Sequence, residues 1–247
     1  MQLEDLIPKG APSEKTIGAV VPHAGYMYSG RVAAAVYARV EFPETFVILG
    51  PNHTGLGSGA AIMTYGQWET PLGQVQIDQE LGKAILANSS VLEEDHLGHL
   101  REHSIEVQLP FLQYFNRLFG FVPICLFSHE YAVCQEVGQA VAKAVRESAK
   151  RVLIVASTDM SHYVSRDEAG AKDRKAIDAI LALDPEGLHR VVRREGISMC
   201  GFHPTTAMLL AAKSLGATRV ELVMYTDSGD MTHNLDEVVA YAGLLVR

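Results

Sequence analysis

The chain alternates between short apolar runs and longer stretches whose apolar residues recur at helical spacing. Six of the apolar runs have the length and the β-branched content of buried strands. These runs are Ile17 to Val21, Phe46 to Leu49, Phe121 to Leu126, Val152 to Ala156, Val220 to Met224 and Val238 to Leu245. Strands that are apolar along their whole length are typical of a sheet covered on both faces.

The stretches between these runs predict helices at Arg31 to Val40, Asp78 to Ala87, Tyr131 to Lys150, Asp167 to Leu183 and Pro204 to Leu215. Apolar positions near Trp68 and Val75 are too close in sequence for a crossover helix, so we expect a hairpin there. The pattern predicts an α/β fold, a three-layer α/β/α sandwich around a mixed, largely parallel sheet. Since no linker or repeat divides the chain, we expect residues 1–247 to form a single domain.

Composition narrows the function classes. The net charge of −8 disfavours a nucleic-acid partner, because an acidic surface repels phosphate. Neither a secretory signal nor an apolar run of membrane-spanning length is present in the sequence, so we expect no membrane contact. The three cysteines, Cys125, Cys134 and Cys200, form no CxxC motif and cannot all pair within the chain. These features predict a protein of the reducing cytoplasm.

Three histidines follow predicted strands within a few residues: His23, His53 and His162. Ligands of open α/β sheets bind beyond the carboxyl ends of the strands. Histidine is a common metal ligand and the usual acid or base near neutral pH. Each of these residues taken alone is also consistent with a loop histidine bonded to backbone, but three at strand ends favour a shared site.

Cys200 directly precedes the helix predicted from Pro204. Amides at a helix N-terminus lower the pKa of a thiol, so we expect a thiolate that acts as metal ligand or nucleophile. The alternative, a buried structural cysteine, is what we expect for Cys125 and Cys134. Asp159 lies three residues before His162, where its carboxylate either orients a histidine, binds metal directly, or caps the helix that follows.

The segment from Glu94 to Glu106 holds three more histidines. Glu102 and Glu106 lie one helical turn apart and are expected to face the same way. We place His103 and Glu106 on the rim of the pocket, together with His203 from the motif around Cys200. The alternative is a solvated acidic loop, to which we assign His96 and His99. The sequence lacks GxSxG, HExxH, P-loop and GxGxxG motifs, which disfavours the enzyme classes that use them.

Several of these segments resemble motifs of the MEMO family, whose prokaryotic members are often labelled AmmeMemoRadiSam system protein B. They are Pro-His-Ala-Gly-Tyr at 22–26 with Ser29-Gly30, Leu-Gly-Pro-Asn-His at 49–53, Thr-Pro-Leu-Gly at 70–73, Glu-His-Ser-Ile-Glu-Val-Gln-Leu-Pro at 102–110, Asp159 with His162, and Cys-Gly-Phe-His-Pro at 200–204. The matches run in order along the chain. The resemblance implies a fold related to that of the class III extradiol dioxygenases, which use non-haem Fe(II).

Carried over by position, the resemblance implies that His23 and His53 are metal ligands and that Cys200 replaces the carboxylate ligand of the dioxygenases. His162 would lie near the metal as an acid or base, and Asp159 would line the same pocket. Two histidines and a carboxylate with open positions characterise Fe(II) oxygenases. A thiolate is a chemically softer ligand than the carboxylate it would replace, and it therefore lets zinc or copper compete with iron for the site.

Three functions remain open on this evidence. The first is a metal-dependent oxidoreductase, with Fe(II) as the expected cofactor, in which His162 moves a proton. The second is a zinc-dependent hydrolase in which His162 or Asp159 activates water. The third is a non-catalytic protein that binds a peptide, a small molecule or a partner, with His162 as the fourth ligand of a closed structural site. The family label suggests a radical-SAM protein as a partner.

Overall fold

The structure is a computed structural model and describes residues 3–8, 10 and 12–247. Four parallel strands form the centre of its sheet, in the spatial order β1 (Gly18–Val21), β8 (Val152–Ser157), β2 (Thr45–Pro51) and β7 (Gly120–Leu126). The carboxyl ends of these strands therefore reach the same edge of the sheet, which is the edge where α/β proteins bind ligands.

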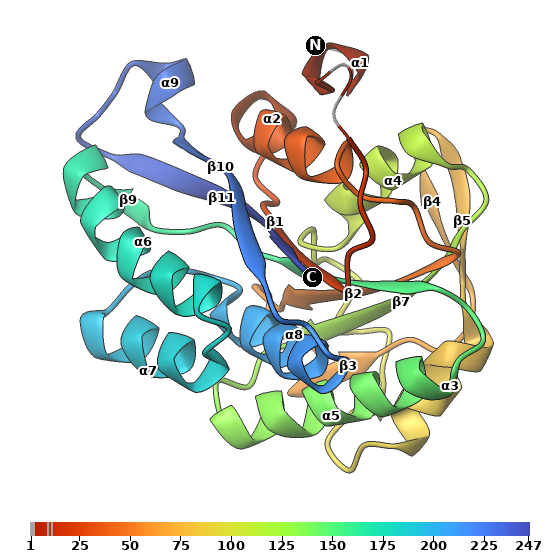
Figure 1. The fold of residues 1–247 in the computed structure, drawn as a ribbon. Helices are drawn as coiled ribbons and strands as arrows, with labels where there is room; N and C mark the ends of the chain where they lie inside the picture. The colour runs from red at the N-terminus through yellow and green to blue at the C-terminus, as the bar shows by residue number, and fades with distance from the viewer. Residues whose placement is uncertain (1–2, 9, 11) are drawn as a thin grey trace.

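Antiparallel strands extend the sheet on both sides (Figure 1). β11 (Val238–Val246) pairs with β1, and β10 (Val220–Asp227) pairs with β11. On the other side, β3 (Ala60–Ile62) runs antiparallel to β7 and carries β6 (Glu93–Glu94). The short strand β9 (His162–Val164) pairs with β11.

Helices cover both faces of the sheet. One face carries α2 (Tyr26–Tyr37), the 3-10 helix η1 (Glu106–Gln108) and α4 (Leu109–Phe115). The other face carries α3 (Gln79–Ala87), α5 (Tyr131–Glu147), α6 (Arg166–Leu181), α7 (Pro185–Glu195) and α8 (Phe202–Ser214). Two short helices, α1 (Leu3–Leu6) and α9 (Gly229–Thr232), lie outside these layers.

Strand side chains alternate between two separate apolar cores. On β2, Val47 and Leu49 join the core beneath α5 and α8, whereas Phe46 and Ile48 join the core beneath α2 and α4. Successive side chains of a strand point to opposite faces, so a strand buried on both faces reads as a continuous apolar run. The predicted α/β class, three layers and mixed sheet are confirmed, and the four central strands form the main parallel part.

The hairpin expected around Trp68 and Val75 is present. β4 (Gln67–Thr70) pairs with β5 (Gly73–Ile77), and Trp68 lies directly opposite Val75. The sequence interpretation missed α7, although its ends carry clear signals. Asp184 caps its first turn by accepting a hydrogen bond from the Gly187 amide, and Gly196 ends it in the left-handed conformation at φ 60°.

Among the described residues, no helix is both long enough and apolar enough to cross a membrane.

Candidate metal centre

Two neighbouring parts of the sheet bring His23 and His53 together. His23 follows the end of β1, His53 follows the end of β2, and β8 lies between these strands. Their ring centroids are 5.3 Å apart. Cys200 comes from the turn before α8, and its Sγ lies 3.3 Å from His23 Nε2. Potential ligand atoms of the three residues all lie within 4.8 Å of one another, so the predicted ligand set is assembled in space.

The hydrogen bonds of Ser157 decide which nitrogen of His23 carries the proton. Ser157 Oγ donates its only hydrogen to the Ser104 carbonyl at 2.5 Å and accepts from Gln108 Nε2 at 2.9 Å. Its remaining lone pair faces His23 Nδ1 at 3.0 Å, so Nδ1–H must be the donor there. His23 Nε2 is then unprotonated and presents its lone pair toward Cys200.

Glu102 plays the same part for His53. Its Oε1 accepts from His53 Nδ1 at 2.9 Å, and its Oε2 accepts from the His53 backbone amide at 2.5 Å. A proton held on Nδ1 leaves Nε2 of His53 as the free donor atom. Metal-binding histidines are commonly oriented in this way, by a carboxylate or another acceptor on the second ring nitrogen.

Glu102 belongs to a second group of close potential ligands, with His53 and His103. Its oxygens also accept from the backbone amides of His103 at 2.9 Å and Ser104 at 2.8 Å. Burial would raise the pKa of Glu102, but these hydrogen bonds outweigh it and lower the pKa to about 2. Three of these hydrogen bonds end on Oε1 and one on Oε2, and together they fix the carboxylate in the position from which it orients His53.

Asp159 lies beside the three residues. Its Oδ1 accepts from the backbone amides of His23 at 2.8 Å and Ala24 at 3.3 Å, and its Oδ2 is 3.9 Å from His23 Nε2. Because Ser165 caps α6, the helix-cap alternative for Asp159 is wrong. The carboxylate instead holds the turn after β1 in place.

The charge states in the site differ from the sequence expectation for the thiol. Cys200 is half-buried, and this burial, together with the charge of Asp159, raises the pKa of its thiol to about 12. The expected lowering by the helix N-terminus is wrong for the metal-free site. Burial also lowers the pKa of His23 to about 4, against an opposing effect of Asp159. At neutral pH the site therefore holds a neutral imidazole, the form that binds metals.

Comparison with known proteins places the chain in a family. The family described as Memo-like protein matches residues 1–245. The chain belongs to this Memo-like family. A MEMO1 family protein of Methanococcoides burtonii is 49% identical over 236 residues, covering 95% of this chain and 88% of that protein. A relative in Methanopyrus kandleri is 48% identical over 234 residues, covering 93% and 83% of the two chains. The resemblance drawn from the motifs is confirmed.

The fold of this Memo-like chain also occurs among solved structures. One of them is the crystal structure of an uncharacterized protein from Escherichia coli K12, with a TM-score of 0.65 at 12% sequence identity. The similarity covers 93% of this chain and 99% of that protein. At this identity the likeness concerns the fold alone.

The Memo-like chain keeps His162 apart from the three close ligand residues. Among the described residues, the groups of ligand atoms within 4.8 Å of one another do not include it. His162 Nδ1 lies 3.0 Å from the Ser198 carbonyl oxygen, and only Nδ1–H can donate to that acceptor. Its Nε2 is therefore free to accept a proton, and a role as acid or base stays a prediction.

The residues predicted for the rim have three different positions. His103 stacks on His53 with ring centroids 5.0 Å apart, so it borders the metal site. Glu106 is exposed while Glu102 is buried, so the two glutamates do not face the same way. His203 is buried, its Nε2 lies 2.8 Å from the Leu126 carbonyl oxygen, and its ring packs on His129. The structure thus places His203 in the core and Glu106 in a separate pocket.

Sequence reasoning missed the two residues that orient the ligands, Ser157 and Glu102. Ser157 is the last residue of β8, which identifies it as a site residue only once β8 is known to lie between β1 and β2. Glu102 was visible within the family motif at 102–110, but its partner His53 is 49 residues away in sequence. A position in a shared motif was the only available signal.

Proposed function

We propose that this Memo-like protein binds one divalent metal ion through His23 Nε2, His53 Nε2 and Cys200 Sγ. The observation that carries this proposal is the double orientation of the imidazoles. Ser157 and Glu102 engage both Nδ1 atoms and leave both Nε2 lone pairs free, that of His23 3.3 Å from the Cys200 sulfur. Three donors of this kind suit iron, zinc or copper. Metal binding would take the proton from the Cys200 thiol, because a thiolate is the ligand form.

The proposed activity is that of a metal-dependent oxidoreductase resembling the class III extradiol dioxygenases. Three protein ligands, with His162 outside their group, match the pattern of catalytic rather than structural sites. Ferrous iron, when bound, supplies redox chemistry with molecular oxygen. His162, with Nδ1 held at the Ser198 carbonyl, would take up or return a substrate proton at Nε2. Asp159 would keep the His23 turn in place and contribute negative charge beside it.

A second candidate is a zinc-dependent hydrolase, which the thiol of Cys200 favours. Catalytic zinc sites accept both histidine nitrogen and cysteine sulfur as ligands, whereas iron oxygenases use a carboxylate as the third ligand. Zinc, when bound, supplies a water of lowered pKa. The same His162 nitrogen would serve as the base.

The deciding experiment is the metal content of untagged protein purified without oxygen, measured by elemental mass spectrometry. We expect about one metal per chain, lost in His23→Ala/His53→Ala and in Cys200→Ser. His96→Ala, which changes an exposed histidine outside the site, should keep full content. If the bound metal is iron, the next step is an oxygen-consumption assay with catechol-like substrates. If it is zinc, the next step is a hydrolase assay. A protein that stays metal-free after reconstitution would overturn both proposed metal-dependent activities. The remaining interpretation would then be a surface that binds a peptide or a partner protein.

The cellular setting is part of the same proposal. We propose a cytoplasmic location, in keeping with three cysteines that are all free. We propose a radical-SAM protein as the partner, on the strength of the family resemblance. Co-purification of an iron–sulfur protein with the untagged chain from its native cells would support this, and its absence under anaerobic conditions would count against it.

A further inference from the structure

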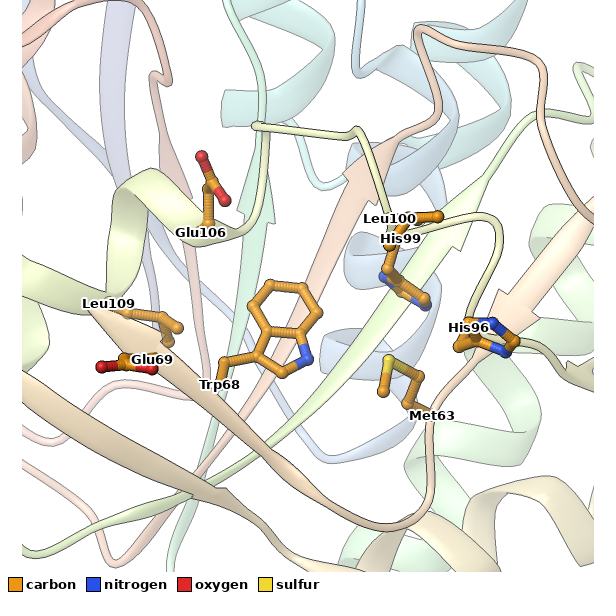
Figure 2. Close-up of a pocket in the computed structure, with 8 residues that line it drawn as sticks. All are labelled: Met63, Trp68, Glu69, His96, His99, Leu100, Glu106 and Leu109. Atoms are coloured by element: carbon orange, nitrogen blue, oxygen red, sulfur yellow. The ribbon is translucent and has the colours of Figure 1, made fainter.

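Two buried titratable side chains, His99 and Asp173, lie outside the proposed metal centre. His99 is only 7% exposed, so the solvated position expected from the sequence is wrong for it, whereas His96 is exposed as expected. The His99 ring packs against Trp68 with ring centroids 5.7 Å apart, and both residues line the pocket shown in Figure 2. This contact makes His99 part of the packing around the hairpin. The contacts of Asp173 lead instead to the site.

Asp173 lies in α6 and is fully buried, with 0% exposure. Its Oδ1 accepts from the Ser161 backbone amide at 3.0 Å and from Ser161 Oγ at 2.6 Å, and its Oδ2 accepts from the Tyr225 hydroxyl at 2.8 Å. None of these donors carries a positive charge. Burial raises the pKa of Asp173, against the opposing effects of these hydrogen bonds and of nearby His162. A carboxyl group that is unfavourable to bury therefore holds Ser161, the residue directly before His162.

The segment that carries His162 is held from two further sides. Ala240 of β11 donates its amide to the Ser161 carbonyl at 2.9 Å. Ser198 Oγ accepts from the His162 amide at 2.7 Å, and the Ser198 carbonyl accepts from His162 Nδ1 at 3.0 Å. Ser198 lies two residues before the proposed ligand Cys200. The ring of His162 is therefore tied to the turn that carries the sulfur, and the backbone before it is tied to β11 and α6.

The residue after His162 shows why this segment needs to be held. Tyr163 has a φ of 57°, in the left-handed region that is unfavourable for a bulky side chain. It is the extra residue of a bulge, because its two neighbours in β9 pair with consecutive residues of β11. A strained backbone of this kind persists only where the surrounding contacts fix it. The hydrogen bonds of Asp173 are such a contact, made from the core.

We propose that Asp173 is a positioning residue for His162. By fixing Ser161, it keeps the His162 ring on the Ser198 carbonyl and leaves Nε2 free to take up a proton. The consequence for catalysis rests on the proposed function, in which His162 moves a substrate proton. The acceptor atom of Asp173, rather than its charge, performs this role, because both bonds to Ser161 end on Oδ1. An amide oxygen in the same place would do the same.

The tautomer of His162 tests this proposal in metal-free protein. Long-range proton–nitrogen NMR correlations at mildly alkaline pH identify it, and His162→Ala assigns its signals. The wild type should carry the proton on Nδ1 alone. In Asp173→Ala we expect a second form protonated on Nε2, and an exchange rate of the Nδ1 proton about 2- to 10-fold higher, as for the loss of one hydrogen bond. Asp173→Asn keeps the acceptor oxygen, and its amide group can donate to the Tyr225 oxygen, so it should match the wild type.

Gln113→Ala is the matched control for a general loss of stability. Gln113 is also buried and its side chain is hydrogen-bonded to Thr70 and Gly73, but it lies in α4 on the other face of the sheet. This variant should lower the urea midpoint without changing the His162 signals. Ser161→Ala removes only the Oγ contact, should give a smaller change in the same direction as Asp173→Ala, and replaces that variant if it does not fold.

Three results would overturn the proposal. They are unchanged His162 signals in Asp173→Ala or its replacement, an equal change in Gln113→Ala, and an Asp173→Asn spectrum that resembles that of Asp173→Ala. The His162 signals are read without metal, and the metal content is measured without reference to His162. A wild type that binds no metal would therefore overturn the proposed function but not the Asp173 contact, and a negative NMR result would leave the proposed ligand set standing.

Discussion

The Glu102 carboxylate holds His53 by both its backbone and its ring. Oε2 accepts from the His53 amide at 2.5 Å and Oε1 from Nδ1 at 2.9 Å. Two bonds to one residue fix the position of the turn after β2 as well as the rotation of the imidazole. Metal binding by His53, as proposed, would therefore depend on a residue outside the proposed ligand set.

Glu102→Gln should weaken metal binding by about 10- to 100-fold, the usual effect of removing an orienting partner. A glutamine has one acceptor oxygen and its amide group cannot accept from the remaining N–H donors. Competition with a chromogenic chelator measures the affinity. Glu93→Gln is the control, since it removes an exposed carboxylate outside the site. Equal affinities in the two variants would show that Glu102 does not orient the ligand.

Ser157→Ala should change the tautomer of His23 before any metal is added. The variant removes the acceptor for Nδ1–H, so the Nε2–H form becomes accessible. Long-range proton–nitrogen NMR correlations distinguish the two tautomers in metal-free protein. We also expect a loss of about 1 to 3 kcal/mol in the free energy of unfolding, because Gln108 Nε2 loses one acceptor. A His23 spectrum identical to that of the wild type would refute the assignment.

Gly201→Ala should destabilise the protein by about 1 to 3 kcal/mol. A Cβ there would lie 2.5 Å from the Ser157 carbonyl oxygen and 2.6 Å from Thr158 Cβ. The turn that carries Cys200 would have to move away from β8, so metal affinity should also fall. Gly170→Ala is the matched control. It lies within α6 with nothing within 4 Å of the added Cβ, and should gain about 0.5 to 1 kcal/mol. Urea unfolding measures both, and equal effects would contradict the close approach.

Asp78→Asn should lower stability at neutral pH by about 1 kcal/mol. Burial alone would raise the pKa of Asp78, but hydrogen bonds from Lys150, the Leu81 amide and Thr45 lower it below 3.8. A lowered carboxyl pKa stabilises the folded state above pH 3.8, and this contribution is lost as the pH falls through the folded pKa. The difference from the wild type should therefore shrink below that pH.

Urea unfolding at several pH values gives this difference directly. Asp236→Asn, at an exposed position, is the control and should leave the free energy of unfolding nearly unchanged at neutral pH. A difference between Asp78→Asn and the wild type that stays constant through the acid range would contradict a charge-dependent contribution.

The sheet and the candidate ligand residues that lie close together were predictable because both depend on patterns within short segments. Continuous apolar runs revealed the strands, and the residues that follow them included His23 and His53. The orienting contacts were not predictable, because they join positions such as Glu102 and His53 that only the strand order brings together. The thiol pKa of Cys200 was predicted in the wrong direction for a similar reason: the position before a helix is visible in sequence, but the burial that dominates is not.

The 177 residues that separate His23 from Cys200 set a time for assembly of the site. At about 5 to 20 residues per second, a ribosome needs about 9 to 35 s to travel that far. During this interval the emerging chain contains His23 and His53 but not yet Cys200. The β8 strand, which carries Ser157, is translated only shortly before Cys200. The proposed ligand set would thus be complete only after Cys200 has been translated, and metal uptake would report that β1, β8 and β2 have come together.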